Sequence, residues 1–415
     1  MRRALAVWAV GLALLATVRP AAASNTTVNI EIDYMVASDH THKPAQAAID
    51  AVVAMFACRG ITCNIVVDEA LPETALLEAK DVSTFFGDAN NDSTFQYIRS
   101  RHFNHAGQAN WHYCLFGHDY QLWGGTTGSS GIAELPGYGF LVALGTGWAG
   151  QVGTNFDQAA TLAHEFGHNL GLHHAGTMDE NVVGASAIDH ASIMSYFYQL
   201  RGVKTHMQCL GMIGDLTLFK DLDYSDGRLP NLNEAALDET RGIGVLGVDW
   251  NCNGSVSGTV AQDLEDPSND GYWCGETGTL QVQNDSNDWQ VVYNSLANPP
   301  APNAVATYSE PCRPQRPDPL VTRPYRLNSV NACATPQPVL TTEACVQGLM
   351  VWVDPNYSGA QAGTGSQPYN YLGQAVLSAP AGSILYLQPG THHSGTSVIS
   401  TPLTLTGPQP VTIVP

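Results

Sequence analysis

The sequence predicts a mixed α/β fold in which helices pack against a sheet. Residues 28–35 alternate apolar and polar side chains, as a half-buried strand does. The alanine- and valine-rich segment 45–57 is typical of a helix, and a second strand pattern follows at 63–69. Strand, helix and strand in succession are typical of a sheet that carries helices on its faces.

The first elements have clear limits in the sequence. Pro44 suits the first position of the first helix, and Gly60 suits its end. Further strands are predicted at 111–118 and 139–145, with glycine-rich loops between them.

Another helix is predicted from Asp157 to Leu170. This segment contains no proline, and Gly167 is its one glycine. Asn155 or Asp157 favours its start, because both residue types accept hydrogen bonds from the N–H groups of a first helical turn.

The 415 residues suggest two or three domains, preceded by a signal peptide at 1–23. Arg2 and Arg3 precede an apolar run at 4–18, and the alanines at 21–23 form a cleavage site. Arg19 ends the apolar run short of the roughly 20 residues that a membrane span needs. The protein is therefore expected to be secreted, without a membrane span.

The chain is acidic, with 37 acidic and 17 basic residues and a formal charge of −20. Removal of the signal peptide takes away three arginines and no acid, which moves the charge from −20 to −23. Such a chain repels phosphate groups, so nucleic acid is not an expected partner.

Nine cysteines follow the predicted cleavage point, and disulfides are the default in an exported protein. The odd number leaves one cysteine free, paired between chains or without its original partner. Cys58 and Cys63 could close a small loop. The sequence has no CxxC pair, so a zinc site built from cysteines is not expected.

The composition changes near residue 296. Residues 296–345 are rich in proline and contain cysteines, which predicts a linker. Residues 346–415 form a further domain of short strands, and from residue 351 it resembles the opening coil of a pectate-lyase-like parallel β-helix. Only one or two coils fit, whereas repeat folds need about three or more units. Either the chain is a fragment or this short, incomplete end is poorly ordered.

The helix predicted at 157–170 carries a metal-binding pattern. His164 and His168 are four residues apart, so they lie on one face of the helix, one turn apart. This spacing lets two imidazoles bind one zinc ion. Glu165 lies beside them and can reach a water on the metal rather than the metal itself.

A third ligand requires the helix to end. His174 follows His168 by six residues, so a continuing helix would direct it away from the metal. Gly171 accepts the left-handed conformation that ends a helix, which lets His174 return as a ligand. Three protein ligands leave a fourth position for water, as in catalytic zinc sites.

These residues make up the pattern HExxHxxGxxH, and with it the chain resembles the metzincin zinc metalloproteases. Met194, in the segment SIMSY at 192–196, matches the methionine turn that packs beneath the metal in this family. The resemblance covers residues 24–295 and implies an α/β (α+β) domain with a twisted sheet and an active-site helix. Ala175, after the third histidine, indicates none of the best-known sub-families.

The resemblance implies a zinc metalloendopeptidase with one catalytic zinc and a protein or peptide substrate. His164, His168 and His174 hold the metal, and Glu165 is the general base for the zinc-bound water. Some metzincins place a tyrosine near the metal or the oxyanion two residues after the methionine. Tyr196 stands at this position, and a purely structural, buried tyrosine fits equally well.

A strand within 131–135 or 139–145 is expected to bind the substrate by strand addition. The alternative function is that of an extracellular adhesive or carbohydrate-binding protein, in which the β-helix-like end binds polysaccharide. The complete zinc motif favours the peptidase.

The candidate calcium ligands are Asp249, Asn251 and Asn253, which are spaced like the first half of a calcium loop. Val260 stands where such a loop has its glutamate, so a plain Asn-Gly turn is favoured over a calcium site.

The other histidines have plainer interpretations. His173 occupies an unspecified motif position and is expected at the surface or behind the ligands. The remaining ones lack ligand spacing and are expected on solvated surface: His40, His42, His102, His105 and His118.

Overall fold

The computed structural model describes residues 26–80, 94–300, 307–308 and 350–414, with internal gaps at 109, 123–124, 127, 179–183, 214–218, 245, 266–272, 362–367, 380–382, 396–403 and 407–410. The predicted signal peptide and most of the predicted linker lie outside these residues. Across the described part of the chain, every helix is too short or too polar to cross a membrane.

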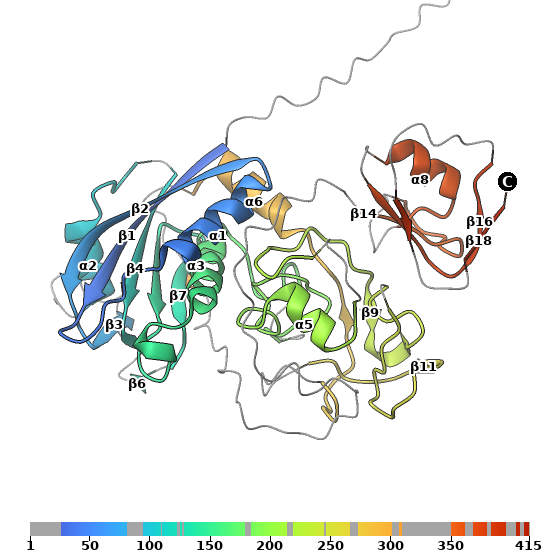
Figure 1. Cartoon of the computed structure of the whole chain (residues 1–415), viewed down its shortest axis with the longest axis horizontal. Helices are drawn as coiled ribbons and strands as arrows, with labels where there is room; N and C mark the ends of the chain where they lie inside the picture. The colour runs from blue at the N-terminus through green and yellow to red at the C-terminus, as the bar shows by residue number, and fades with distance from the viewer. Residues whose placement is uncertain are drawn as a thin grey trace, which may run out of the picture.

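A six-stranded, mostly parallel sheet forms the centre of the N-terminal part (Figure 1). Its strands occur in the order β13-β7-β8-β4-β1-β2. Strands β2, β1, β4 and β8 run parallel, whereas β7 runs antiparallel to β8 and β13 antiparallel to β7. The bounds are Thr26–Val36 for β1, Ile61–Pro72 for β2, Trp111–Gly117 for β4, Gly131–Leu135 for β7, Gly139–Ala143 for β8 and Thr307–Tyr308 for β13. The mixed α/β class is the one that the sequence predicts.

Helices cover both faces of this sheet. Helices α1 (Gln46–Ala57) and α3 (Asn155–Asn169) share one apolar core with β1, to which Ile30 contributes. Helix α2 (Phe95–His102) packs in a second core, to which the same strand contributes Met35. Alternate side chains of β1 therefore serve opposite faces, as the period of a strand requires.

The start of α1 differs from the prediction. The helix begins at Gln46, with Ala45 in extended conformation (ψ 138°) as its N-cap, so Pro44 lies before the cap instead of in the first turn. The cause is a hydrogen bond to another helix: the backbone N–H of Ala45 donates to Oε1 of Gln158 in α3 at 2.8 Å.

Short elements complete the N-terminal part and the region after α3. Near the sheet lie β3 (Leu76–Lys80), β5 (Asp119–Leu122), β6 (Gly125–Thr126) and the 3-10 turn η1 (Ala149–Gln151). Beyond α3 lie α5 (Val203–Cys209), β9 (Leu232–Asn233), η2 (Glu234–Ala236), β10 (Leu237–Asp238), β11 (Thr259–Val260), β12 (Val282–Gln283) and α6 (Asp288–Ala297).

The C-terminal residues form a small module of parallel strands around one helix (Figure 1). Its elements are β14 (Met350–Val353), α8 (Leu372–Ser378), β15 (Ile384–Leu387), β16 (Gly390–His393), β17 (Thr404–Thr406) and β18 (Val411–Val414). Strand β15 pairs in parallel with β17, and β16 pairs in parallel with β18. Stacked coils would pair in this way, and the β-helix assignment itself stays a prediction.

The C-terminal module packs against the preceding region. Trp352 and Tyr386 belong to the same apolar core as α1 and α3, and their rings lie 4.5 Å apart between centroids. A Cβ atom at Gly244 would lie 2.6 Å from the Trp352 ring, so the indole rests directly on this glycine. Arg241 adds an ion pair with Asp354 at 3.3 Å.

The cysteines differ from expectation in one respect. The predicted Cys58–Cys63 loop is wrong: Cys63 is a buried free thiol on β2, and Cys58 is disulfide-bonded elsewhere. Strand β2 begins at Ile61, and its alternation directs Cys63 into the core against α1. A disulfide joins Cys252 to Cys274.

Because Trp352 links the C-terminal module to the main core, we expect Trp352→Ala to destabilise the chain by about 3–5 kcal/mol, as for other buried tryptophans. Leu377→Ala on α8 is the matched control, since Leu377 is 78% exposed and its loss should change stability by less than about 0.5 kcal/mol. Urea unfolding followed by fluorescence and circular dichroism measures both. Equal stabilities of the two variants would contradict the packing described here.

Candidate metal centre

Helix α3 is positioned by its N-terminal cap. The helix begins at Asn155, two residues before the prediction, because Thr154 is the cap. Oγ1 of Thr154 accepts the N–H of Asp157 at 3.1 Å, and the Asp157 carboxylate accepts the N–H of Thr154 at 2.8 Å. This reciprocal pair satisfies two N–H groups of the first turn. The sequence suggests Asn155 or Asp157 at the start of the helix, and neither of them is its N-cap.

His164 and His168 are fully buried on α3, and each ring has a defined proton position. Nδ1 of His164 donates to the carbonyl oxygen of Ile193 at 2.8 Å, and Nδ1 of His168 donates to that of Leu172 at 2.7 Å. A carbonyl oxygen only accepts hydrogen bonds, so each proton sits on Nδ1 and each Nε2 keeps its lone pair.

The two Nε2 atoms fit a shared zinc ion. They lie 3.1 Å apart, and neither carries a proton to donate to the other. Two nitrogens at about 2.0–2.1 Å from one tetrahedral zinc lie about 3.3–3.4 Å apart. Burial first, and then the nearby His174, hold the pKa of His164 well below its usual range, which keeps the ring neutral and able to bind a cation.

His174 joins this pair through a left-handed turn. Gly171 has φ 92°, the conformation that the sequence predicts for the end of the helix. The ring of His174 lies 4.7 Å from that of His168 and 5.3 Å from that of His164. One ligand atom from each of the three lies within 4.8 Å of the others, so the structure brings the predicted ligands together. His173, in contrast, is exposed.

The methionine turn lies directly beneath α3. Met194 is fully buried, and its sulfur lies 2.5 Å from the place that a Cβ atom would take at Gly167. The glycine inside the helix therefore allows a close approach that a larger residue would prevent. The same turn supplies the Ile193 carbonyl that orients His164.

Tyr196 lies against two of the predicted ligands. Its ring centroid is 4.4 Å from that of His174 and 5.8 Å from that of His164, and the side chain is 7% exposed. The role of the tyrosine, catalytic or purely structural, stays a prediction.

Glu165 lies between α3 and the start of β7. The side chain is fully buried, and Oε1 is 2.5 Å from the position of a Cβ atom at Gly131, the first residue of the strand. Gly131 therefore leaves the space that the carboxylate occupies. The sequence analysis did not identify this role of Gly131, although a glycine at the start of a strand can indicate a close approach.

A buried ion triad holds the segment before the methionine turn. Nε2 of His190 lies 3.2 Å from Oδ2 of Asp288, and Nδ1 lies 3.4 Å from Oδ1 of Asp285. Burial opposes the charged ring, but the two carboxylates outweigh it and raise the pKa of His190 to about 10. Asp288 begins α6, so this triad connects the methionine turn to that helix.

The proposed calcium ligands form hydrogen bonds within their own loop. The carboxylate of Asp249 accepts the N–H groups of Asn253 at 3.1 Å and Gly254 at 2.7 Å. The amide oxygen of Asn251 also accepts the N–H of Asn253. These oxygens thus serve a turn, and Asp249 belongs to none of the converging groups of His, Cys, Asp and Glu side chains among the described residues.

The structure overturns the expectation of solvated surface for three histidines. His40, His42 and His118 converge on Glu73, with ligand atoms within 4.8 Å of one another, and His42 and His118 are buried. His118 follows His40 by 78 residues and His42 by 76, so local spacing in the sequence hides the group. The available signal was that His118 ends a predicted strand, and that His40, His42 and Glu73 follow two other predicted strands within seven residues.

His102 and His105 agree better with a surface position. Each is about 30% exposed and pairs with one carboxylate, His102 with Glu69 at 2.8 Å and His105 with Glu31.

Comparisons with known proteins give distant structural likeness. No family model matches the chain, and no curated protein matches its sequence. An archaemetzincin from Methanopyrus kandleri is 14% identical, with a TM-score of 0.25, over 36% of this chain and 77% of that one. A zinc-dependent peptidase from Methanocorpusculum labreanum is 16% identical, with a TM-score of 0.22, over 35% of this chain and 82% of that one. At these scores the likeness carries no argument, and the site is interpreted from its own geometry.

We expect His190→Gln to destabilise the protein by about 3–5 kcal/mol, because it leaves buried carboxylates without their cation. The raised pKa makes this contribution complete below the unfolded value of about 6.5, and the contribution is lost as the pH rises through about 10. Denaturant unfolding of parent and variant at several pH values measures the difference. His102→Gln is the control, because its partly exposed pair is worth about 0–1 kcal/mol. A difference that grows between pH 7 and pH 10 would refute the assignment.

Proposed function

We propose that this chain is a secreted, metzincin-like zinc endopeptidase whose catalytic domain spans residues 24–295. The observation that carries the proposal is the pair of oriented rings on α3. Both His164 and His168 donate Nδ1–H to a carbonyl and direct an unprotonated Nε2 to a common point, beside which His174 also lies. Such hydrogen bonds from Nδ1 orient the rings of histidines that bind a metal ion through Nε2.

The donor set favours a catalytic zinc over a structural one. Three imidazoles come from this group, which leaves a fourth coordination position for water and substrate. A zinc ion held there would polarise the peptide carbonyl and lower the pKa of a bound water towards about 7.

Glu165 is placed to act as the general base. It follows His164 directly, it is not one of the converging ligands, and its carboxylate lies against the first residue of β7. Its carboxylate would take a proton from the attacking water and return it to the amine of the leaving product. Burial removes competing water from the carboxylate, which strengthens its electrostatic interactions.

Strand β7 is the candidate substrate-binding strand. It is antiparallel to β8 and lies between β8 and the two-residue edge strand β13. Residues 307–308 of the same chain pair with it in antiparallel fashion at Glu134 and Leu135, so this edge accepts an added strand. An extended peptide paired at Gly131 would lie beside the Glu165 carboxylate.

Substitution of the base tests the proposal. We expect Glu165→Gln to keep the metal and the fold, because Glu165 is not a ligand, and to lower the rate of peptide hydrolysis by roughly 10² or more. Protein cleavage, zinc content and melting temperature are measured together. Glu69→Gln is the control, since this glutamate is 50% exposed. Hydrolysis by Glu165→Gln within a few-fold of the parent, or hydrolysis that resists a chelator, would rule out the mechanism.

Tyr196 is tested by removal of its hydroxyl group alone. If the hydroxyl donates to the oxyanion, Tyr196→Phe should reduce kcat by about 10²–10³, with little change in KM and full zinc content. The matched control is Tyr293→Phe. The hydroxyl of Tyr293 donates to the carbonyl of Arg59, and neither residue belongs to the predicted metal centre. Normal kcat combined with a loss of about 1–3 kcal/mol of stability would make Tyr196 a structural residue.

A further inference from the structure

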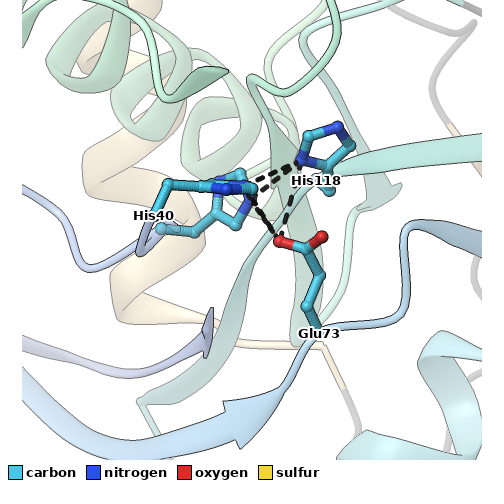
Figure 2. Close-up of side chains that lie close together, drawn as sticks. His40, Glu73 and His118 are labelled. Atoms are coloured by element: carbon cyan, nitrogen blue, oxygen red, sulfur yellow. Dashed lines mark hydrogen bonds and ion pairs between the residues drawn. The ribbon is translucent and has the colours of Figure 1, made fainter. Parts of the chain in front are cut away.

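A second group of metal-binding side chains lies at one edge of the main sheet. His40 and His42 follow β1, Glu73 follows β2, and His118 follows β4. These three strands are neighbours and run parallel, so their carboxyl ends meet at the same edge. Figure 2 shows His40, Glu73 and His118 directed towards one another at this place.

Hydrogen bonds of the backbone hold the group in position. The chain reverses after β1, where the N–H of Ala37 donates to the carbonyl of His40 at 3.0 Å and that of His42 to the carbonyl of Met35 at 2.9 Å. The N–H of Glu73 donates to the carbonyl of Val36 at 3.0 Å. Backbone hydrogen bonds alone therefore hold the ends of β1 and β2 together.

The four ligand atoms form a nearly regular tetrahedron. Nε2 of His40 lies 3.1 Å from Nε2 of His42 and 3.2 Å from Nδ1 of His118, and the last two atoms are 3.2 Å apart. Oε2 of Glu73 lies 3.0, 3.1 and 3.7 Å from the same three nitrogens. A tetrahedral zinc with bonds of about 2.0–2.1 Å places its ligands about 3.3–3.4 Å apart.

Hydrogen bonding within the group cannot explain this geometry. A ring nitrogen carries either one N–H or one lone pair, in a single direction in the plane of the ring. Each of the three nitrogens has two or three polar neighbours within 3.2 Å, so one such direction cannot serve them all. One cation at the centre would accept a lone pair from every member.

The ring nitrogens outside the group have polar neighbours suited to orient metal ligands. Nδ1 of His40 lies 2.9 Å from the carboxylate of Asp39, and Nε2 of His118 lies 3.4 Å from Oγ1 of Thr146. Such contacts are typical of metal-binding histidines. Gly145 leaves space for the His118 ring, because a Cβ atom there would lie 2.6 Å from it.

We propose that His40, His42, Glu73 and His118 bind a second zinc ion, which has a structural role. Four protein ligands complete the tetrahedron and leave no position for water, whereas the α3 group supplies three. The near-equal separations also favour tetrahedral zinc over the square-planar arrangement preferred by Cu²⁺. The ion clamps the ends of β1, β2 and β4.

The two groups are separate. The loop after His42 meets the N-terminal half of α3, where the N–H of Ala45 binds Gln158, whereas His164 and His168 lie in its C-terminal half. The nearer ligand, His164, lies six residues beyond Gln158, which is about 9 Å along the helix at about 1.5 Å per residue. The two groups share no residue.

Metal content of the full-length protein tests the second site. After dialysis, the parent chain should hold two zinc ions by elemental analysis, not the single ion that the zinc motif implies. The double variant His164→Ala/His168→Ala should retain one, and His42→Ala should retain one. The control His393→Gln, an exposed histidine of the C-terminal module, should retain two. One zinc in the parent and none in the double variant would overturn the proposal, while leaving the α3 site intact.

A second measurement covers variants that fold poorly. Apo parent protein is titrated with Co²⁺, whose absorption spectrum reports four-coordinate tetrahedral binding. We expect two equivalents of Co²⁺ to bind with tetrahedral spectra. In Glu73→Gln one of these two equivalents should bind more weakly. The hydrolytic activity of this variant is measured separately. We also expect zinc to raise the melting temperature of the double variant. A single tetrahedral equivalent in the parent, together with no zinc effect on the melting of the double variant, would exclude the site.

Discussion

The site and the fold both depend on the burial of α3. Fourteen of its fifteen residues are buried, so this helix has no solvent face on which polar groups could be hydrated. A buried polar group is costly unless it is hydrogen-bonded. Gln158 therefore accepts the N–H of Ala45 and donates to the carbonyl of Val152, and Asn169 donates to the carbonyls of Glu134 and Gly139. These bonds fix the rotation of the helix, and with it the direction of His164.

The need to pair buried polar groups also determines which nitrogen carries the proton in the two predicted metal-binding rings. In water, either nitrogen of a neutral imidazole can carry the proton. In the buried interior, the carbonyls of Ile193 and Leu172 each demand a donor, which assigns the protons of His164 and His168 to Nδ1. The cost of leaving a carbonyl unpaired thus prepares two lone pairs before any metal arrives. Both carbonyls belong to segments that follow α3, so the orientation of the rings depends on chain beyond the helix.

Much of this arrangement could be predicted from the sequence, because it is local. The spacing of His164 and His168, the left-handed Gly171 and the strand patterns of β1, β2 and β4 each lie within a few residues. Helix starts were less accurate. The cap of α3 was overlooked although Thr154 and Asp157 are local partners, whereas Ala45 binds Gln158, 113 residues away. The roles of His164, His168 and His174 as metal ligands stay predictions.

The histidine group at the sheet edge was missed for a physical reason. Its members are assembled by the parallel pairing of three strands, and pairing between distant segments leaves no period in the sequence. His42 and His118 are each unremarkable in isolation. Together with Glu73 they become a tetrahedron only because β4, β1 and β2 are neighbours in that order. Sheet order was the missing information. With it, the polar residues in the loops after β1, β2 and β4 would have identified the group.

The sheet-edge group and the α3 group lie against different strands of the main sheet. The loops at the carboxyl ends of β1, β2 and β4 converge on His40, His42, Glu73 and His118, whereas the antiparallel strand β7 meets Glu165. Thr146, in the loop between β8 and α3, donates its N–H to Asp119 at 3.1 Å, directly beside His118. A clamp on His118 therefore also restrains the loop that leads into α3. A structural ion at one end of the sheet would hold the entry of the helix. His164 and His168 further along the same helix, with His174 beyond its end, would serve a substrate paired with β7.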